Sequence, residues 1–195
     1  MKKFKSIYML LLIVAIVPFV SSCGYNTMVS MDEGVKSQWA QVQNAYQRRA
    51  DLIPNLVNTV QGYAKYEQGT LTAVVEARAK ATSVNVDASK LNAASIKQFQ
   101  EAQGGLSSAL SKLLVVVEKY PDLKANQNFL DLQAQLEGTE NRIAVERQKF
   151  NDATKDYNSY IRKFPQIMFS GWFGFQKKDY FEADKGAQKA PEVKF

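Results

Sequence analysis

Residues 126–163 read NQNFLDLQAQLEGTENRIAVERQKFNDATKDYNSYIRK, and this stretch decides the fold. Its large apolar residues recur at spacings of three, four or seven, which is the pattern of one face of an α-helix. These residues, continued by Phe164, are Phe129, Leu132, Leu136, Ile143, Phe150, Tyr157 and Ile161. At 1.5 Å per residue the helix is about 57 Å long. A helix of this length predicts an elongated antiparallel up-and-down bundle, which is an all-α fold.

The segment before it has the same pattern, interrupted by a proline. Apolar residues recur at spacings of three and four from Val35 to Ala64, and the phase passes through Pro54 without a slip. We therefore predict one long helix over residues 28–80 with a kink at Pro54, which frees the carbonyl of Ala50. The alternatives are a new helix capped by Asp51, or a break near Gln68-Gly69-Thr70.

A third helical segment lies between these two. Residues 83–94 lack periodicity and predict a mobile connection. Ser95 is the expected N-cap of the next helix, which runs to Tyr120 and ends at Pro121. The bundle therefore has three helices, or four if the first long segment is broken.

The composition excludes several kinds of chemistry. The 195 residues, 46% of them hydrophobic, fit one globular domain, and they contain no His and one Cys. An intramolecular disulfide, a Cys-type zinc site and the commonest general base are all excluded. Because no motif of nucleophile, phosphate loop or metal ligands is present, we predict a protein that is not an enzyme, with no catalytic residues, metal site or cofactor.

The N-terminus has the features of a secretory signal. Three lysines in the first five residues precede an uncharged apolar stretch over residues 7–20 that is too short to span a membrane. The sequence Val20-Ser-Ser-Cys23 resembles a bacterial lipobox. It implies cleavage after residue 22 and lipidation of Cys23, with residues 23–27 as the anchored N-terminus. The alternative is an uncleaved signal anchor with an incidental cysteine.

The charge of the remaining chain is modest. Cleavage lowers the basic residues from 25 to 22 against 19 acidic residues, a net charge of +3. No run of basic residues interleaved with aromatics occurs, so a nucleic-acid partner is not expected. The anticipated location is a membrane, lipid-anchored on an extracytoplasmic face, with inner and outer membrane both open.

Several motifs carry a family resemblance. They are YQRRADLIPNLVNTVQGY at residues 46–63, EARA at 76–79, YPDLKAN at 120–126, ENRI at 140–143, YN at 157–158, FGF at 173–175 and YFEA at 180–183. In this order they resemble the signature of the LemA family. The resemblance implies a membrane-tethered four-helix up-and-down bundle, which makes a break near Pro54 or near Gly69 necessary.

Polar residues beside the apolar stripes form the first candidate site. We expect either a buried polar layer that fixes helix register or a groove for a partner or ligand. Its members are Arg49, Asp51, Asn55, Asn58, Glu140 and Arg142.

The tail over residues 165–195, which follows the bundle of residues 28–164, is the second candidate. Six aromatic residues lie between Phe169 and Phe181. We expect them to fold back and cap the bundle, with Trp172 buried. The alternative is a surface for a partner or for lipid, formed by Trp172, Phe173 and Phe175.

These features favour a lipid-anchored binding or scaffold protein of the cell envelope, with the membrane and an envelope protein as partners. The alternative is an accessory subunit of a membrane protease or envelope-stress complex. A hydrolase would have to work without His and survive chelation.

Overall fold

A computed structural model describes the chain over residues 2–64 and 67–182, with side chains from residue 24 onward. This part is helical and contains no strand, so the predicted all-α fold is confirmed. The long helices are α1 (Lys2–Tyr63), α2 (Gln68–Ser83), α3 (Ala93–Val117) and α5 (Gln127–Ile161). Shorter elements are the one-turn helix α4 (Pro121–Lys124) and the 3-10 turns η1 (Ala88–Lys90) and η2 (Gln166–Met168).

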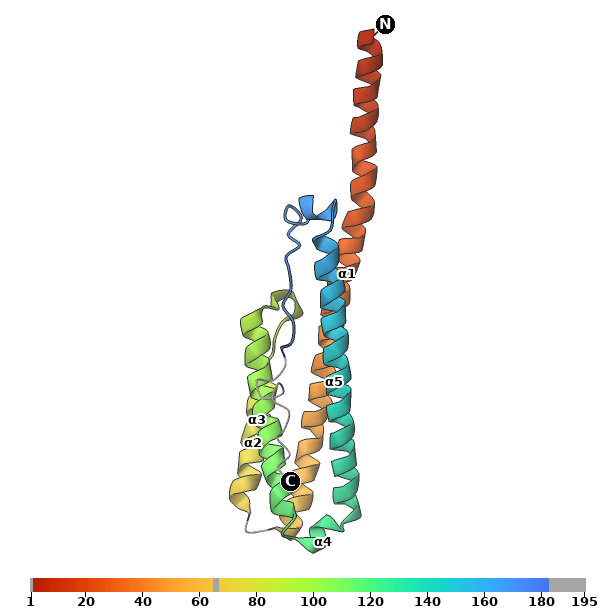
Figure 1. Ribbon diagram of the computed structural model, residues 1–195. Coiled ribbons are helices and arrows are strands. Elements are labelled where there is room, and N and C mark those ends of the chain that lie inside the picture. The colour runs from red at the N-terminus through yellow and green to blue at the C-terminus, as the bar shows by residue number, and fades with distance from the viewer. Residues whose placement is uncertain (1, 65–66, 183–195) are drawn as a thin grey trace, which may run out of the picture.

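The four long helices form an elongated antiparallel bundle. α1 packs along α5 and α2, and α2 packs against α3. The N-terminal part of α1 continues beyond the bundle as a single projecting helix (Figure 1). The loop that contains η2 lies at this same end, whereas α4 lies at the opposite end.

The first long segment breaks after Tyr63 and not at Pro54, which corrects the predicted helix over residues 28–80. α1 runs through Pro54 without interruption, and Asp51 caps no helix. The carbonyl of Ala50, which Pro54 leaves without its helical donor, accepts a hydrogen bond of 2.8 Å from Arg78 Nε. Because this donor replaces the missing N–H, the helix does not have to end at the proline.

The connection before α3 packs onto α1, and α3 begins at Ala93, earlier than predicted. Trp39 Nε1 donates to the carbonyl of Val86 at 2.9 Å, and Val86 is buried. The N-cap of α3 is Asn92, whose side chain accepts from the N–H of Ser95 while Ser95 Oγ accepts from the N–H of Asn92. The expected cap, Ser95, is therefore the second member of a capping box.

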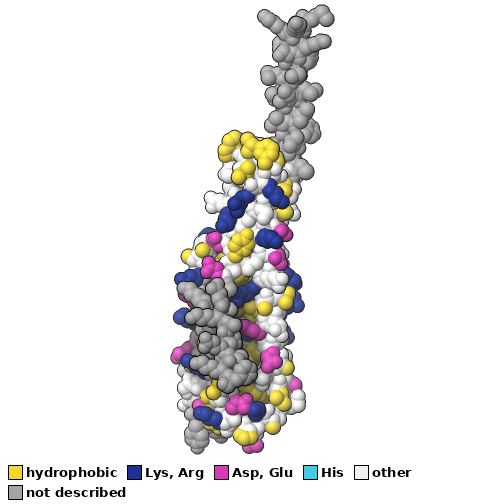
Figure 2. Space-filling view, in the orientation of Figure 1, with side chains coloured by type: hydrophobic (Ala, Val, Ile, Leu, Met, Phe, Trp, Pro, Cys, Tyr) yellow, Lys and Arg dark blue, Asp and Glu magenta, His cyan; other side chains and the backbone are white. Residues whose placement is uncertain are grey.

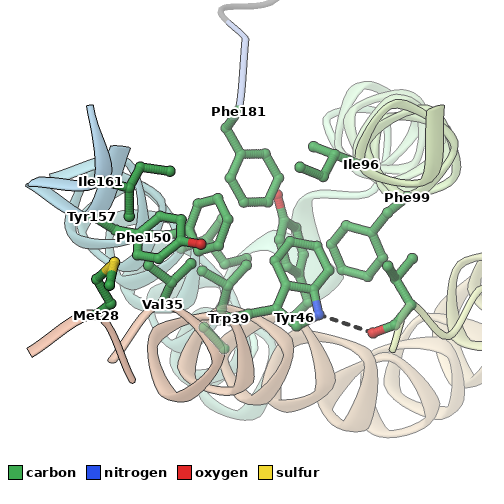
Figure 3. Packing of buried hydrophobic residues seen from close by; sticks show 14 residues of the cluster. Met28, Val35, Trp39, Tyr46, Ile96, Phe99, Phe150, Tyr157, Ile161 and Phe181 are labelled. Carbon is green, nitrogen blue, oxygen red and sulfur yellow. Dashed lines mark hydrogen bonds between the residues drawn. The ribbon is translucent and has the colours of Figure 1, made fainter. Parts of the chain in front are cut away.

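Two apolar clusters fill the bundle. The aromatic cluster near the projecting end of α1 has Trp39 at its centre, with ring centroids 5.3 Å from Phe99, 5.5 Å from Phe150 and 5.5 Å from Phe181 (Figure 3). The second cluster is mainly aliphatic and includes Leu56. On α1 the two clusters meet around Arg49, which lies between Tyr46 and Leu52.

Candidate functional site

Arg49 forms a polar layer that joins three helices. Its side chain is 2% exposed. Its Nη1 donates to Glu140 Oε2 on α5 at 2.7 Å and to Ser107 Oγ on α3 at 3.0 Å, and its Nη2 donates to Gln103 Oε1 at 2.9 Å. Because a buried guanidinium needs these partners, the layer couples the register of α1, α3 and α5.

Only two of the six predicted layer residues, Arg49 and Glu140, meet in the structure. Asp51 is exposed and accepts a hydrogen bond of 2.7 Å from Gln47, one turn away on α1. Residues two apart on a helix point in very different directions, so Asp51 cannot share the buried face of Arg49. The structure therefore places Asp51 outside the layer to which the sequence analysis assigned it.

The other three predicted residues also lie outside the layer. Asn55 and Asn58 are exposed on α1. Arg142 is exposed and pairs at 2.8 Å with Glu146, whose side chain is buried. The burial of Glu146 alone would raise the pKa of its carboxyl, but hydrogen bonds from Lys149 and Gln38 and the nearby Arg142 hold the pKa below its usual value.

Gln103 and Ser107 were missed by the sequence analysis. Gln103 occupies an apolar position of the α3 stripe, four residues after Phe99 and three before Leu106, and it is buried. A lone glutamine in phase with an apolar stripe is therefore the signal that could have found it. Its partner on α1 could not be read from the local pattern, because the two residues are 54 positions apart.

A second site holds the C-terminal segment against α5. Asn158 accepts from the N–H of Lys178 at 2.9 Å and donates to its carbonyl at 2.8 Å. Asn151 does the same for Phe181, at 2.9 and 3.2 Å. We call Asn151 and Asn158 the tail clamp. The two asparagines lie two turns apart on α5 and hold a non-helical segment through its backbone.

Side chains of the segment add further contacts. Lys178 Nζ lies 2.8 Å from Asp32 on α1, and the ring of Phe181 packs against the rings of Trp39 and Phe150, at centroid distances of 5.5 and 5.4 Å (Figure 3). Burial alone would raise the pKa of Asp32, but hydrogen bonds from Lys178 and Lys36 outweigh it and lower the pKa below its ordinary value of 3.8. The segment is therefore fixed by charge and by an aromatic anchor as well as by its backbone.

The loop between α5 and this segment exposes large apolar side chains. We call the following residues, with their exposed fractions, the apolar tip: Phe164 79%, Ile167 55%, Met168 58%, Trp172 84% and Phe173 50%. The predicted burial of Trp172 under a capping tail is wrong. Phe181 and the half-buried Phe175 do fold back onto the bundle, so the tail divides into a packed part and an exposed part.

No metal site or membrane span is found in the part of the chain that the structure describes. Among its His, Cys, Asp and Glu residues, no group of three could hold a metal ion. None of its helices has an apolar stretch long enough to cross a membrane. The side chain of Cys23 and residues 183–195 lie outside the described structure.

The fold and these sites define an elongated, antiparallel all-α bundle with a polar layer around the buried Arg49 and a clamped C-terminal segment. Comparison with known sequences assigns it more closely. The chain belongs to the LemA family, which matches it over residues 38–195. The resemblance drawn from the sequence motifs is thereby confirmed.

Individual relatives share a low sequence identity with this chain, but the similarity extends over most of their length. "Magnetosome protein MamQ 2" of Paramagnetospirillum magneticum is 26% identical over 95% of this chain and 75% of its own length. "Magnetosome protein MamQ" of Magnetospirillum gryphiswaldense is 25% identical over 93% of this chain and 73% of its own. "Protein LemA" of Metamycoplasma hominis is 25% identical over 84% of this chain and 71% of its own.

Proposed function

We propose that the protein is a lipid-anchored protein of the cell envelope, tethered through Cys23 on an extracytoplasmic face, that acts as a non-enzymatic binding or scaffold protein. The lipobox-like Val20-Ser-Ser-Cys23 supports the anchor. A cysteine that carries several acyl chains would give stable attachment, since one chain alone binds a bilayer only marginally.

The observation that carries the binding role is the tail clamp. α3 and α5 do not pack closely against each other along their lengths, and residues 176–182 lie against α5 instead. The contacts of Asn151 and Asn158 go to backbone N–H and C=O groups, which every polypeptide carries. Backbone bonds for affinity and side-chain pockets for specificity are how proteins hold extended partner segments.

A hollow beside the clamped segment offers room for a partner. It has a volume of about 610 Å³ and is lined by Lys97, Gln100 and Glu101 of α3 and by Lys177 and Asp179. Both charge signs occur in this lining, so a polar polypeptide suits it better than an apolar small molecule.

In-cell photo-crosslinking tests the proposal. A photoreactive residue at Lys97, beside the clamped segment, should give a discrete intermolecular adduct in membranes. The matched control is Val75 on α2, which is 48% exposed and does not line the hollow. Equal adducts at both positions, or adducts only within the chain, would contradict a binding role for this side.

The identity of the captured protein separates the scaffold from the accessory subunit. Recovery of a membrane protease or stress complex at Lys97 would favour the accessory role. Turnover of generic ester, glycoside or peptide substrates by the purified chain, lost on mutation of a described residue, would overturn the non-enzymatic part.

A further inference from the structure

Among the side chains that the structure describes, the apolar tip brings together five large apolar ones that are at least half exposed, and the packing of the bundle does not explain their location. Trp172 and Phe164 are more than three-quarters exposed, although the chain buries Phe175 and Phe181 of the same tail at least in part. A contiguous exposed patch of this kind marks a protein or membrane contact. In Figure 2 apolar side chains gather at this end of the molecule.

The tip lies at the level of the residue next to Cys23. A Cβ placed on Gly24 would lie 3.9 Å from Gln166 Nε2, so the tip loop packs directly against α1 at that point. The ring of Tyr25 lies 5.0 Å from that of Phe173 and 5.8 Å from that of Phe175. α1 projects past the bundle at this same end (Figure 1). A bilayer that holds the chain at Cys23, or through the apolar stretch over residues 7–20, therefore begins at the height of the tip.

The charges around the tip suit a bilayer surface. Residues 161–178 contain no Asp or Glu, and their basic residues Arg162, Lys163 and Lys177 are exposed. The remaining one, Lys178, is paired with Asp32. Basic residues beside a membrane are attracted to anionic headgroups, and Trp is enriched at the interface between headgroups and acyl chains.

We infer that the apolar tip inserts into the interfacial region of the membrane that tethers the chain, with Trp172 as its deepest aromatic residue and Arg162, Lys163 and Lys177 at the headgroups. The inference rests on the proposed membrane tether. It adds a second contact at a fixed distance from the first. Two contacts, one at Cys23 and one at the tip, hold the long axis of the bundle away from the bilayer, whereas a single flexible tether leaves its orientation free.

Tryptophan quenching by brominated lipid tests this insertion. The full chain is purified from membranes in detergent and returned to vesicles of phosphatidylcholine and phosphatidylglycerol with brominated acyl chains. The chain has two tryptophans, and Trp39 is fully buried in the bundle. In the wild type the brominated lipid should quench the fluorescence of Trp172. In Trp172→Phe the remaining fluorescence, from Trp39, should not be quenched by the brominated lipid.

The outcomes separate the tip from the tether. If the chain does not float with vesicles at all, the tether itself fails. If it floats but Trp172 stays insensitive to brominated lipid and is quenched by aqueous iodide, the tip does not insert and the inference is overturned.

Lys163→Glu with Lys177→Glu gives an independent readout, because it should weaken Trp172 quenching in phosphatidylglycerol vesicles more than in pure phosphatidylcholine. Both positions are exposed, so an unchanged melting temperature is expected to confirm that the variant is folded.

Discussion

Arg78 Nε on α2 donates a hydrogen bond of 2.8 Å to the carbonyl oxygen of Ala50 on α1. This is the oxygen that the backbone N–H of residue 54 would bind in an ordinary helix, and proline has no such N–H. The contact therefore explains how α1 passes through Pro54. It also joins α1 to α2, so a feature that weakens one helix locally becomes a tertiary link between two.

The first prediction is a double-mutant cycle on this link. Arg78→Met should lower the free energy of unfolding by about 1–2 kcal/mol, because it leaves the Ala50 carbonyl without a donor. In a Pro54→Ala background, where residue 54 again supplies the N–H, the same change should cost less than about 0.5 kcal/mol. Urea denaturation followed by circular dichroism measures both. Equal costs in the two backgrounds would show that Arg78 acts independently of the proline.

The second prediction compares Arg49 with Asp51, two residues apart on α1. Arg49→Met should cost about 2–3 kcal/mol, because it leaves Gln103 and Ser107 without their shared partner in the interior. Asp51→Asn, at an exposed position, should change stability by less than about 0.5 kcal/mol. Thermal and chemical unfolding of the two variants is the measurement. A large effect of Asp51→Asn would restore the layer predicted from the sequence.

The third prediction addresses the tail clamp. Asn151→Ala removes both hydrogen bonds to the backbone of Phe181, at a net cost of about 1 kcal/mol for each bond. Amide exchange at Phe181 should become faster by one to two orders of magnitude, on the scale of about 1.4 kcal/mol per tenfold. Hydrogen exchange read by mass spectrometry on a peptide that spans residues 176–182 reports it. Asn141→Ala, at an exposed position of the same helix, is the matched control and should leave the exchange unchanged.

The fourth prediction is a pH dependence of the Asp32–Lys178 pair. The pKa of Asp32 is lower in the folded chain than in the unfolded one, so unfolding takes up a proton and the pair stabilises the fold above the ordinary carboxyl pKa. This contribution should be lost as the pH falls through the folded pKa, below about pH 4. The stability difference between wild type and Asp32→Asn should therefore shrink on acidification.

Lys178→Met provides the control for that pair. It removes the same 2.8 Å contact from the tail side, so its stability deficit should shrink over the same pH range as that of Asp32→Asn. A deficit that is constant between pH 3 and pH 6 in both variants would mean that the ion pair does not contribute.

The fifth prediction concerns Cys23. Cys23→Ala should leave the chain either unprocessed or released from the membrane, because it removes the site for acyl chains. Intact-mass spectrometry and membrane flotation measure the two outcomes. Cys23→Ser, which keeps the size of the side chain and removes the thiol, should behave like Cys23→Ala. A Cys23 variant of mature mass that stays in membranes would exclude the lipobox.

Several features were set by the sequence alone, because they depend on local spacing. Helical periodicity places Phe129, Ile143, Phe150 and Tyr157 on one face of a long helix, and all four are buried. That helix begins at Gln127, close to the predicted start at residue 126, and Asn126 is its N-cap. The family assignment likewise follows from motifs that are read along the chain.

Tertiary structure alone decided the remaining features, because their partners lie far away in the chain. Pro54 predicts a weak point, but whether the helix breaks there depends on the donor that Arg78 brings from α2. Arg49 is identifiable as a candidate, yet Gln103 and Glu140 reach it only after three helices pack. Trp172 and Phe181 are both aromatic residues of the same tail, but Trp172 lies beyond the end of the bundle and is exposed, whereas Phe181 lies between its helices and is buried. Burial depends on the position of a residue relative to the whole bundle, which no local pattern contains.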